Sequence, residues 1–253
     1  MMNGPRTLDG KRIAVLAADG FEKVELTAPV AALRDAGAKV AVVALHPGRI
    51  RGMNVHQPSD LVPVDKTVNE VSAADFDGLL IPGGYISPDL LRQSALARAF
   101  VRAMNELGKP VALMSQAAAI LTSAGLAASR RLTSWPGTRD DLVNAGAIWL
   151  NQEVVRDGNW LSSRGAQDLA PFIRDLIPFF AGEQAHGAAP DKALSDPQLE
   201  EPSGTPGQSL HWLSTPSVGA MLGLALLGVG VVAANRGRRK KQEQIAGPDR
   251  PET

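Results

Sequence analysis

Short apolar runs alternate with amphipathic stretches between residues 11 and 182. Continuous apolar runs are typical of strands buried on both faces, whereas apolar positions three or four residues apart are typical of helices that cover a sheet. This pattern predicts strands at 12–17, 40–45, 78–81, 110–114, 148–150, 154–156 and 160–162. It predicts helices at 22–36, 88–107, 116–123 and 168–180. Strands alternating with helices indicate an α/β fold, a doubly wound parallel sheet with helices on both faces.

The alternation stops after residue 182. Residues 183–216 contain five prolines among Gly, Ser and acidic residues, at positions 190, 197, 202, 206 and 216. Prolines at this spacing interrupt helices and strands, so the segment is predicted to be a linker. The chain is thereby divided into an N-terminal tail (1–10), an α/β domain (11–182), a Pro/Gly-rich linker (183–216), an apolar helix (217–235) and a basic C-terminal tail (236–253).

The apolar helix has the composition of a membrane span. Residues 218–234 contain no polar side chain, and His211-Trp212 and the basic run 236–241 flank them. About 17–25 apolar residues cross a bilayer, so this run lies at the short end of the range. Aromatic and basic flanks are typical of the interfaces. We expect a single-pass C-terminal anchor, with a buried or peripheral helix as the alternative.

The charges that flank the apolar helix and the length of the folded α/β domain predict opposite orientations of this anchor in the membrane. Residues 236–253 hold six basic and three acidic side chains, whereas the linker is acidic, which by the positive-inside rule favours an external α/β domain. Long folded domains do not follow that rule, however, and the first apolar run, 13–18, is too short for the core of a signal peptide. We therefore expect the α/β domain on the cytoplasmic side of the membrane.

The amino-acid composition excludes several kinds of binding site and catalysis. The chain has 26 basic and 26 acidic residues, a balance that disfavours general nucleic-acid binding. It has no cysteine, which removes disulfides, thiol catalysis and cysteine-based metal sites together. Its four histidines do not form a ligand pattern, so no metal and no cofactor are expected.

Ligands of doubly wound sheets bind beyond the carboxyl ends of the strands, near the point where the winding changes direction. Three such ends are the loop 19–25, the turn 82–85 with its Pro-Gly-Gly sequence, and the sharp turn at Ser115. We expect these three segments to surround a pocket that could hold a small-molecule ligand.

Several blocks around these turns occur in a recognisable order: GFEKVEL (20–26), LIPGG (80–84), KPVA (109–112), SAGL (123–126), TSWPG (133–137), DDLVNAG (140–146) and VVRDGNWLSSR (154–164). Together they resemble the PfpI family of intracellular proteases and amidases, in the DJ-1/PfpI branch of the class I glutamine amidotransferase-like superfamily. The resemblance spans roughly residues 11–182. It implies a flavodoxin-like sandwich, and it implies a homo-oligomer, since relatives form dimers or larger rings.

The resemblance also implies where the family's functional groups lie. A nucleophilic cysteine at the elbow between strand and helix corresponds to Ser115, and the histidine that follows it corresponds to Gln116. A glutamate of the first loop corresponds to Glu25, and the amides that form an oxyanion site correspond to Gly83 and Gly84. The chain thus keeps the scaffold of the family and replaces its cysteine and histidine.

The replacement changes the chemistry. A helix N-terminus can lower the pKa of a thiol enough to ionise it, whereas serine needs a positioned base, usually a histidine. None of the four histidines is expected near the elbow; His46, at the end of the second strand, should lie toward the edge of the sheet. Ser115 is therefore interpreted either as a surviving nucleophile or as a small polar residue in an inactive pocket.

The other candidates also have structural interpretations. Glu25 could be a first-turn residue favoured by the helix dipole, and Gly83-Gly84 an ordinary turn. Gln116 could hold a ligand or lie exposed. Arg164 could face an anionic ligand, but we expect it to pair with Asp168.

Three hypotheses for function follow. The first is a membrane-tethered pseudoenzyme that acts by ligand binding, assembly or stress-related sensing. The second is a residual hydrolase or amidase that uses Ser115 with a Gly83/Gly84 oxyanion site. The third is a structural partner whose pocket is vestigial.

Overall fold

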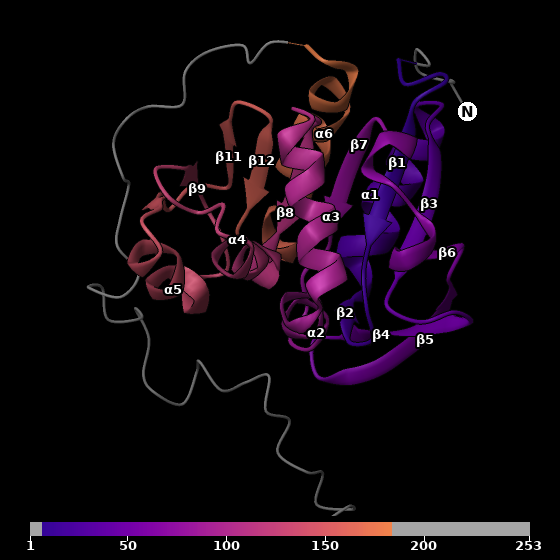
Figure 1. Ribbon diagram of the computed structural model, residues 1–253, viewed down its shortest axis with the longest axis horizontal. Coiled ribbons are helices and arrows are strands. Elements are labelled where there is room, and N and C mark those ends of the chain that lie inside the picture. Colours follow the sequence, from indigo (N-terminus) through magenta and orange to yellow (C-terminus); the bar gives the residue numbers. More distant parts are fainter. Residues whose placement is uncertain (1–6, 184–253) are drawn as a thin grey trace, which may run out of the picture. The chain divides into compact units, whose positions relative to one another are not determined.

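The computed structural model describes residues 7–183, which contain the predicted α/β domain (Figure 1). The predicted linker, apolar helix and basic tail lie outside the described residues, so the expected anchor at 217–235 stays a prediction. Within residues 7–183, no helix combines the length and apolar character needed to cross a bilayer.

The described residues form a seven-stranded sheet in the order β11-β12-β8-β7-β1-β3-β6. Its strands are β1 (Arg12–Leu16), β3 (Lys39–Ala44), β6 (Lys66–Thr67), β7 (Gly78–Ile81), β8 (Val111–Met114), β11 (Val154–Asp157) and β12 (Trp160–Ser163). All pairs are parallel except the edge pair β11–β12. From β1 the chain winds outward to β3 and β6, then returns to β7 and winds the other way. The predicted doubly wound sheet is confirmed, and the winding changes direction between β1 and β7.

Helices cover both faces of the sheet, and two hydrophobic clusters lie beneath them. Helices α1 (Lys23–Asp35) and α6 (Leu169–Ala181) pack on one face; α2 (Ser87–Gln93), α3 (Ala95–Glu106), α4 (Ala119–Ala124) and α5 (Arg139–Asn144) pack on the other (Figure 1). In β1, Ile13 and Val15 belong to the cluster beneath α1 and α6, and Ala14 and Leu16 belong to the cluster on the opposite face. Side chains alternate between the faces of a strand, so an unbroken apolar run fills both clusters at once.

One predicted helix is wrong in its extent. The stretch 88–107 is two helices, α2 and α3, separated at Ser94. The backbone of Ser94 is extended, and its hydroxyl accepts a hydrogen bond from the amide of Ala97 over 3.2 Å. A serine in this role caps a new helix. The helix predicted at 116–123 likewise begins with a 3-10 turn, η3 (Ser115–Ala118), before α4.

Two small sheets accompany the main one. Strand β2 (Phe21–Glu22) pairs with the hairpin of β4 (Arg49–Asn54) and β5 (Gln57–Pro63), and β9 (Arg131–Leu132) pairs with β10 (Ile148–Trp149). The strand predicted at 148–150 therefore belongs to a two-stranded sheet. The hairpin was not predicted from sequence because most of its residues are exposed, and polar residues and prolines interrupt its apolar positions. The remaining short turns are η1 (Val68–Glu70), η2 (Ala73–Asp75), η4 (Pro136–Thr138) and η5 (Ala166–Asp168).

Candidate ligand pocket at the strand ends

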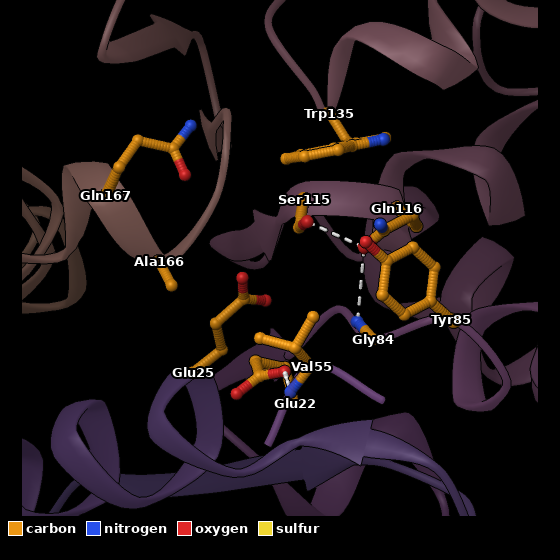
Figure 2. Close-up of a pocket in the computed structure, with 10 residues that line it drawn as sticks. All are labelled: Glu22, Glu25, Val55, Gly84, Tyr85, Ser115, Gln116, Trp135, Ala166 and Gln167. Carbon is orange, nitrogen blue, oxygen red and sulfur yellow. Dashed lines mark hydrogen bonds between the residues drawn. The ribbon is translucent and has the colours of Figure 1, made fainter. Parts of the chain in front are cut away.

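A cavity of about 200 Å³ lies beyond the carboxyl ends of β1, β7 and β8, where the winding of the sheet changes direction (Figure 2). It is lined by Glu22, Glu25, Val55, Gly84, Tyr85, Ser115, Gln116, Trp135, Ala166 and Gln167. The structure thus brings together segments that lie far apart in the sequence. Glu25, Ser115, Gln116 and Gly84 line the cavity, and Gly83 adjoins it.

Ser115, the first residue of η3, forms a strained elbow directly after β8. Its φ angle is +56°, and its side chain is buried. A non-glycine residue in this left-handed conformation costs about 1–2 kcal/mol. The neighbouring Gly83 permits the close approach of its turn, because a Cβ atom there would lie 2.5 Å from Ser115 Cβ and 2.6 Å from Glu25 Oε2. The elbow that the family resemblance implies is present in the fold.

Glu25 lies in the first turn of α1 and is only 2% exposed. Its Oε2 accepts a hydrogen bond from the amide of Gly83 over 2.8 Å. Burial raises the pKa of Glu25 to about 7, and the nearby negative charge of Glu22 adds to the increase. Hydrogen bonds from the Gly83 and Ala166 amides oppose that increase of the pKa, as does the Ser115 hydroxyl when it donates to Glu25 instead of Gln116. Glu25 therefore populates both protonation states near neutral pH.

Gln116 makes the central polar contacts of the cavity. Its Oε1 accepts hydrogen bonds from the Ser115 hydroxyl over 2.6 Å and from the amide of Gly84 over 3.2 Å (Figure 2). The two amides expected to form an oxyanion site are thus both engaged, Gly83 by Glu25 and Gly84 by Gln116. Neither amide is free for a substrate oxygen in this arrangement.

Other residues complete the lining of the cavity, and one of them, Val55, was not predicted from the sequence. Val55, at the tip of the β4–β5 hairpin, has a φ angle of +56°, and its amide donates to Glu22 Oε2 over 2.8 Å. Glu22 thereby links the hairpin to the pocket. Tyr85 and Trp135 present partly exposed rings along the rim (Figure 2). Tyr85 belongs to the turn 82–85 that the sequence placed at the pocket, whereas nothing local marks Val55.

The histidines of the described domain lie elsewhere. His46 Nε2 contacts Asp19 Oδ2 over 2.7 Å, and this interaction raises the pKa of His46. No imidazole lines the cavity in the part of the chain that the structure describes. His186 and His211 lie outside that part.

Arg164 forms an ion pair near the cavity-lining residues 166 and 167. Arg164 binds Asp168 through two hydrogen bonds of 2.7 and 2.8 Å, which confirms the pairing expected from the sequence. Residues 7–183 contain no group of three or more His, Asp or Glu side chains placed to hold a metal ion.

The doubly wound sheet, with a strained elbow at the end of a central parallel strand beside a buried glutamate and a Gly-Gly turn, is an α/β domain with a flavodoxin-like fold. Residues 11–178 match the DJ-1/PfpI family, and the chain belongs to this family. The resemblance read from the sequence blocks is therefore confirmed.

Three known proteins illustrate the relationship. Deglycase PfpI of Pyrococcus furiosus is 40% identical over 166 residues, which cover 66% of this chain and 97% of the relative. Protein/nucleic acid deglycase 2 of Escherichia coli is 38% identical over 168 residues, covering 66% of this chain and 96% of the relative. The crystal structure of Drosophila melanogaster DJ-1beta aligns with a TM-score of 0.63 and 28% identity, covering 68% of this chain and 91% of that one. Almost the full length of each is therefore aligned with about two thirds of this chain.

Proposed function

We propose that the domain binds a small-molecule ligand in the Ser115 pocket, carries out no thiol-dependent protease or deglycase chemistry, and acts through ligand binding, assembly or stress-related sensing. One observation carries the proposal. In the observed arrangement the hydroxyl at the elbow donates its single proton to Gln116 Oε1, an amide oxygen, and not to the carboxyl group of Glu25 that also lies beside it. An amide oxygen is too weak a base to activate an alcohol, and the chain has no cysteine to replace the hydroxyl by a thiolate.

A second candidate function is a residual hydrolase or amidase that uses Ser115. Two observations favour it: the strained elbow is retained, and Glu25, with a pKa of about 7, lies beside Ser115. Matching a base to the working pH is what general base catalysis requires. This candidate needs Gln116 to release both groups, so that the Ser115 oxygen can attack a substrate carbonyl carbon and the Gly84 amide can hold the carbonyl oxygen.

Turnover and binding assays on the same preparation separate the two. The full chain and its Ser115→Ala variant are incubated with methylglyoxal, glycated amino acids and peptide amides, and thermal melting is recorded with each compound. Ligand-induced melting shifts without turnover support the binding function. Turnover in the wild-type protein that disappears in S115A would establish the hydrolase instead. Turnover that survives in S115A would contradict the Ser115 mechanism.

We also propose that residues 217–235 anchor the domain to a membrane, with the domain on the cytoplasmic side, and that the domain self-associates. The first proposal is supported by the uninterrupted apolar run 218–234 and its basic flank. The second is supported by membership of a family whose members commonly oligomerise. Fractionation and sedimentation test them, as set out in the Discussion.

A further inference from the structure

Two donors of the pocket converge on one oxygen that belongs to the protein itself. The Ser115 hydroxyl and the Gly84 amide both point at Gln116 Oε1, at 2.6 and 3.2 Å (Figure 2). The two donors come from different strand ends, β8 and β7, so their convergence depends on the sheet and not on the short loop at Gln116 alone. Two fixed donors around one carbonyl oxygen are the arrangement by which proteins orient a bound carbonyl group.

The identity of the oxygen is set by chemistry. If the Gln116 amide were rotated by 180°, its NH₂ group would face the Gly84 N–H, and two donors would oppose each other. The peptide group that carries the Gly84 N–H is held in this orientation, because its carbonyl oxygen, that of Gly83, accepts a hydrogen bond from the Glu22 amide over 3.0 Å. The carbonyl oxygen of Gln116 is therefore the group that fills the site.

We propose that Gln116 is a built-in occupant of a carbonyl-binding site, and that the ligand of this site is a small uncharged carboxamide whose oxygen replaces Gln116 Oε1 between Ser115 and Gly84. The proposal deepens the ligand-binding function and rests on it. The Gln116 side chain is itself a primary carboxamide, so the pocket already accommodates this chemical group.

The charges around the cavity favour an amide over an acid. Glu22 and Glu25 contribute carboxyl groups, and none of the described lining residues is Lys, Arg or His. A carboxylate ligand would therefore meet like charge without a compensating cation, whereas the N–H groups of an amide are donors for carboxylate oxygens. Aldehydes and ketones have the carbonyl oxygen but lack these N–H groups.

Displacement of Gln116 is feasible because its side chain is only half-buried. The displaced state gives up two internal hydrogen bonds, so it is a minority of the population. Only molecules in which Gln116 has left the site can bind the ligand, so the apparent affinity falls in proportion to their fraction. If about a tenth of the molecules are in this state, the apparent Kd is about tenfold weaker than the intrinsic Kd. Removing the Gln116 side chain should therefore raise the affinity for the ligand by the same factor.

The test measures binding of acetamide, with acetate as the charged control, to the full chain and to Gln116→Ala. Binding is followed by the shift of the Trp135 indole signal in ¹⁵N-labelled protein, identified by its loss in Trp135→Phe, because Trp135 lines the cavity. Gln93→Ala is the matched control, since Gln93 is an exposed glutamine of α2 that pairs with Asp89. We expect Q116A to bind acetamide at least tenfold more tightly than the wild-type protein, Q93A to match the wild type, and acetate to bind more weakly than acetamide throughout.

Each other outcome overturns the inference in a recognisable way. Equal affinity in wild type and Q116A would show that Gln116 does not compete with the ligand, and weaker affinity in Q116A would make Gln116 a ligand contact; either leaves the binding function standing. Tighter binding of acetate would overturn the ligand class. Absence of binding by every variant would overturn the carboxamide site, and the melting shifts with other compounds would still decide the binding function. If Q116A melts early, Gln116→Ser, which also vacates the site, is used with the same expectations.

Discussion

Replacing Glu25 with glutamine should remove a pH dependence of stability that one buried carboxyl group imposes on the domain. Glu25 is 2% exposed, and burial raises its pKa from an ordinary 4.5 to about 7. Each unit of pKa difference between the folded and unfolded states corresponds to about 1.4 kcal/mol. The difference at Glu25 therefore amounts to about 3 kcal/mol of unfolding free energy.

The sign follows from proton binding. Between pH 4.5 and 7 the unfolded chain has lost the Glu25 proton while the folded domain keeps it, so the free energy of unfolding falls as the pH rises. The contribution is fully present below pH 4.5 and is lost as the pH passes 7. Glutamine does not ionise, and its carbonyl oxygen can still accept the Gly83 amide that Glu25 Oε2 now accepts.

Denaturant unfolding of the wild-type protein, Glu25→Gln and Glu106→Gln from pH 4.5 to 8 tests this reasoning. Glu106 is an exposed residue at the end of α3, so E106Q makes the same chemical change at the surface. We expect the stability of E25Q relative to wild type to rise by about 3 kcal/mol across this range, and E106Q to follow the wild-type profile. Parallel profiles for E25Q and wild type would refute a raised pKa at Glu25.

Four further outcomes are expected. The double variant Ser115→Cys/Gln116→His should carry a thiol whose alkylation rate titrates below the free value of about 8.5, because the elbow is retained; titration near 8.5 would show that the elbow no longer activates a thiol. Gly83→Ala should lower the unfolding free energy by about 1–3 kcal/mol, since its Cβ would lie 2.5 Å from a neighbouring Cβ; unchanged denaturant midpoints would contradict this close packing. The chain truncated after Gly182 should be soluble and melt cooperatively, whereas the full chain should stay with membranes through carbonate and high-salt washes; release by salt alone would refute a spanning segment. The truncated chain should also self-associate in sedimentation at several concentrations, and a strictly monomeric result would refute this.

The sequence determined the architecture of the described domain. Four continuous apolar runs became the parallel strands β1, β3, β7 and β8, because a run without polar residues can be buried only between two layers. The same reasoning placed Ser115, Glu25 and the Gly-Gly turn at strand ends that meet where the winding changes direction. The break at Ser94 was missed because the apolar spacing continues across it, although a serine cap was a local signal.

Only the tertiary structure decided what the site residues do to one another. Glu25 accepts from an amide 58 residues away, and Gln116 from one 32 residues away. Local patterns report whether a side chain is buried, but hydrogen-bond partners depend on distances of a few tenths of an ångström between separate strand ends, which only packing fixes. For the same reason the raised pKa of Glu25 and the engagement of the Gly84 amide by Gln116 could not be read from the sequence. A carboxyl group's pKa and a donor's availability are properties of the surroundings that the fold assembles around them.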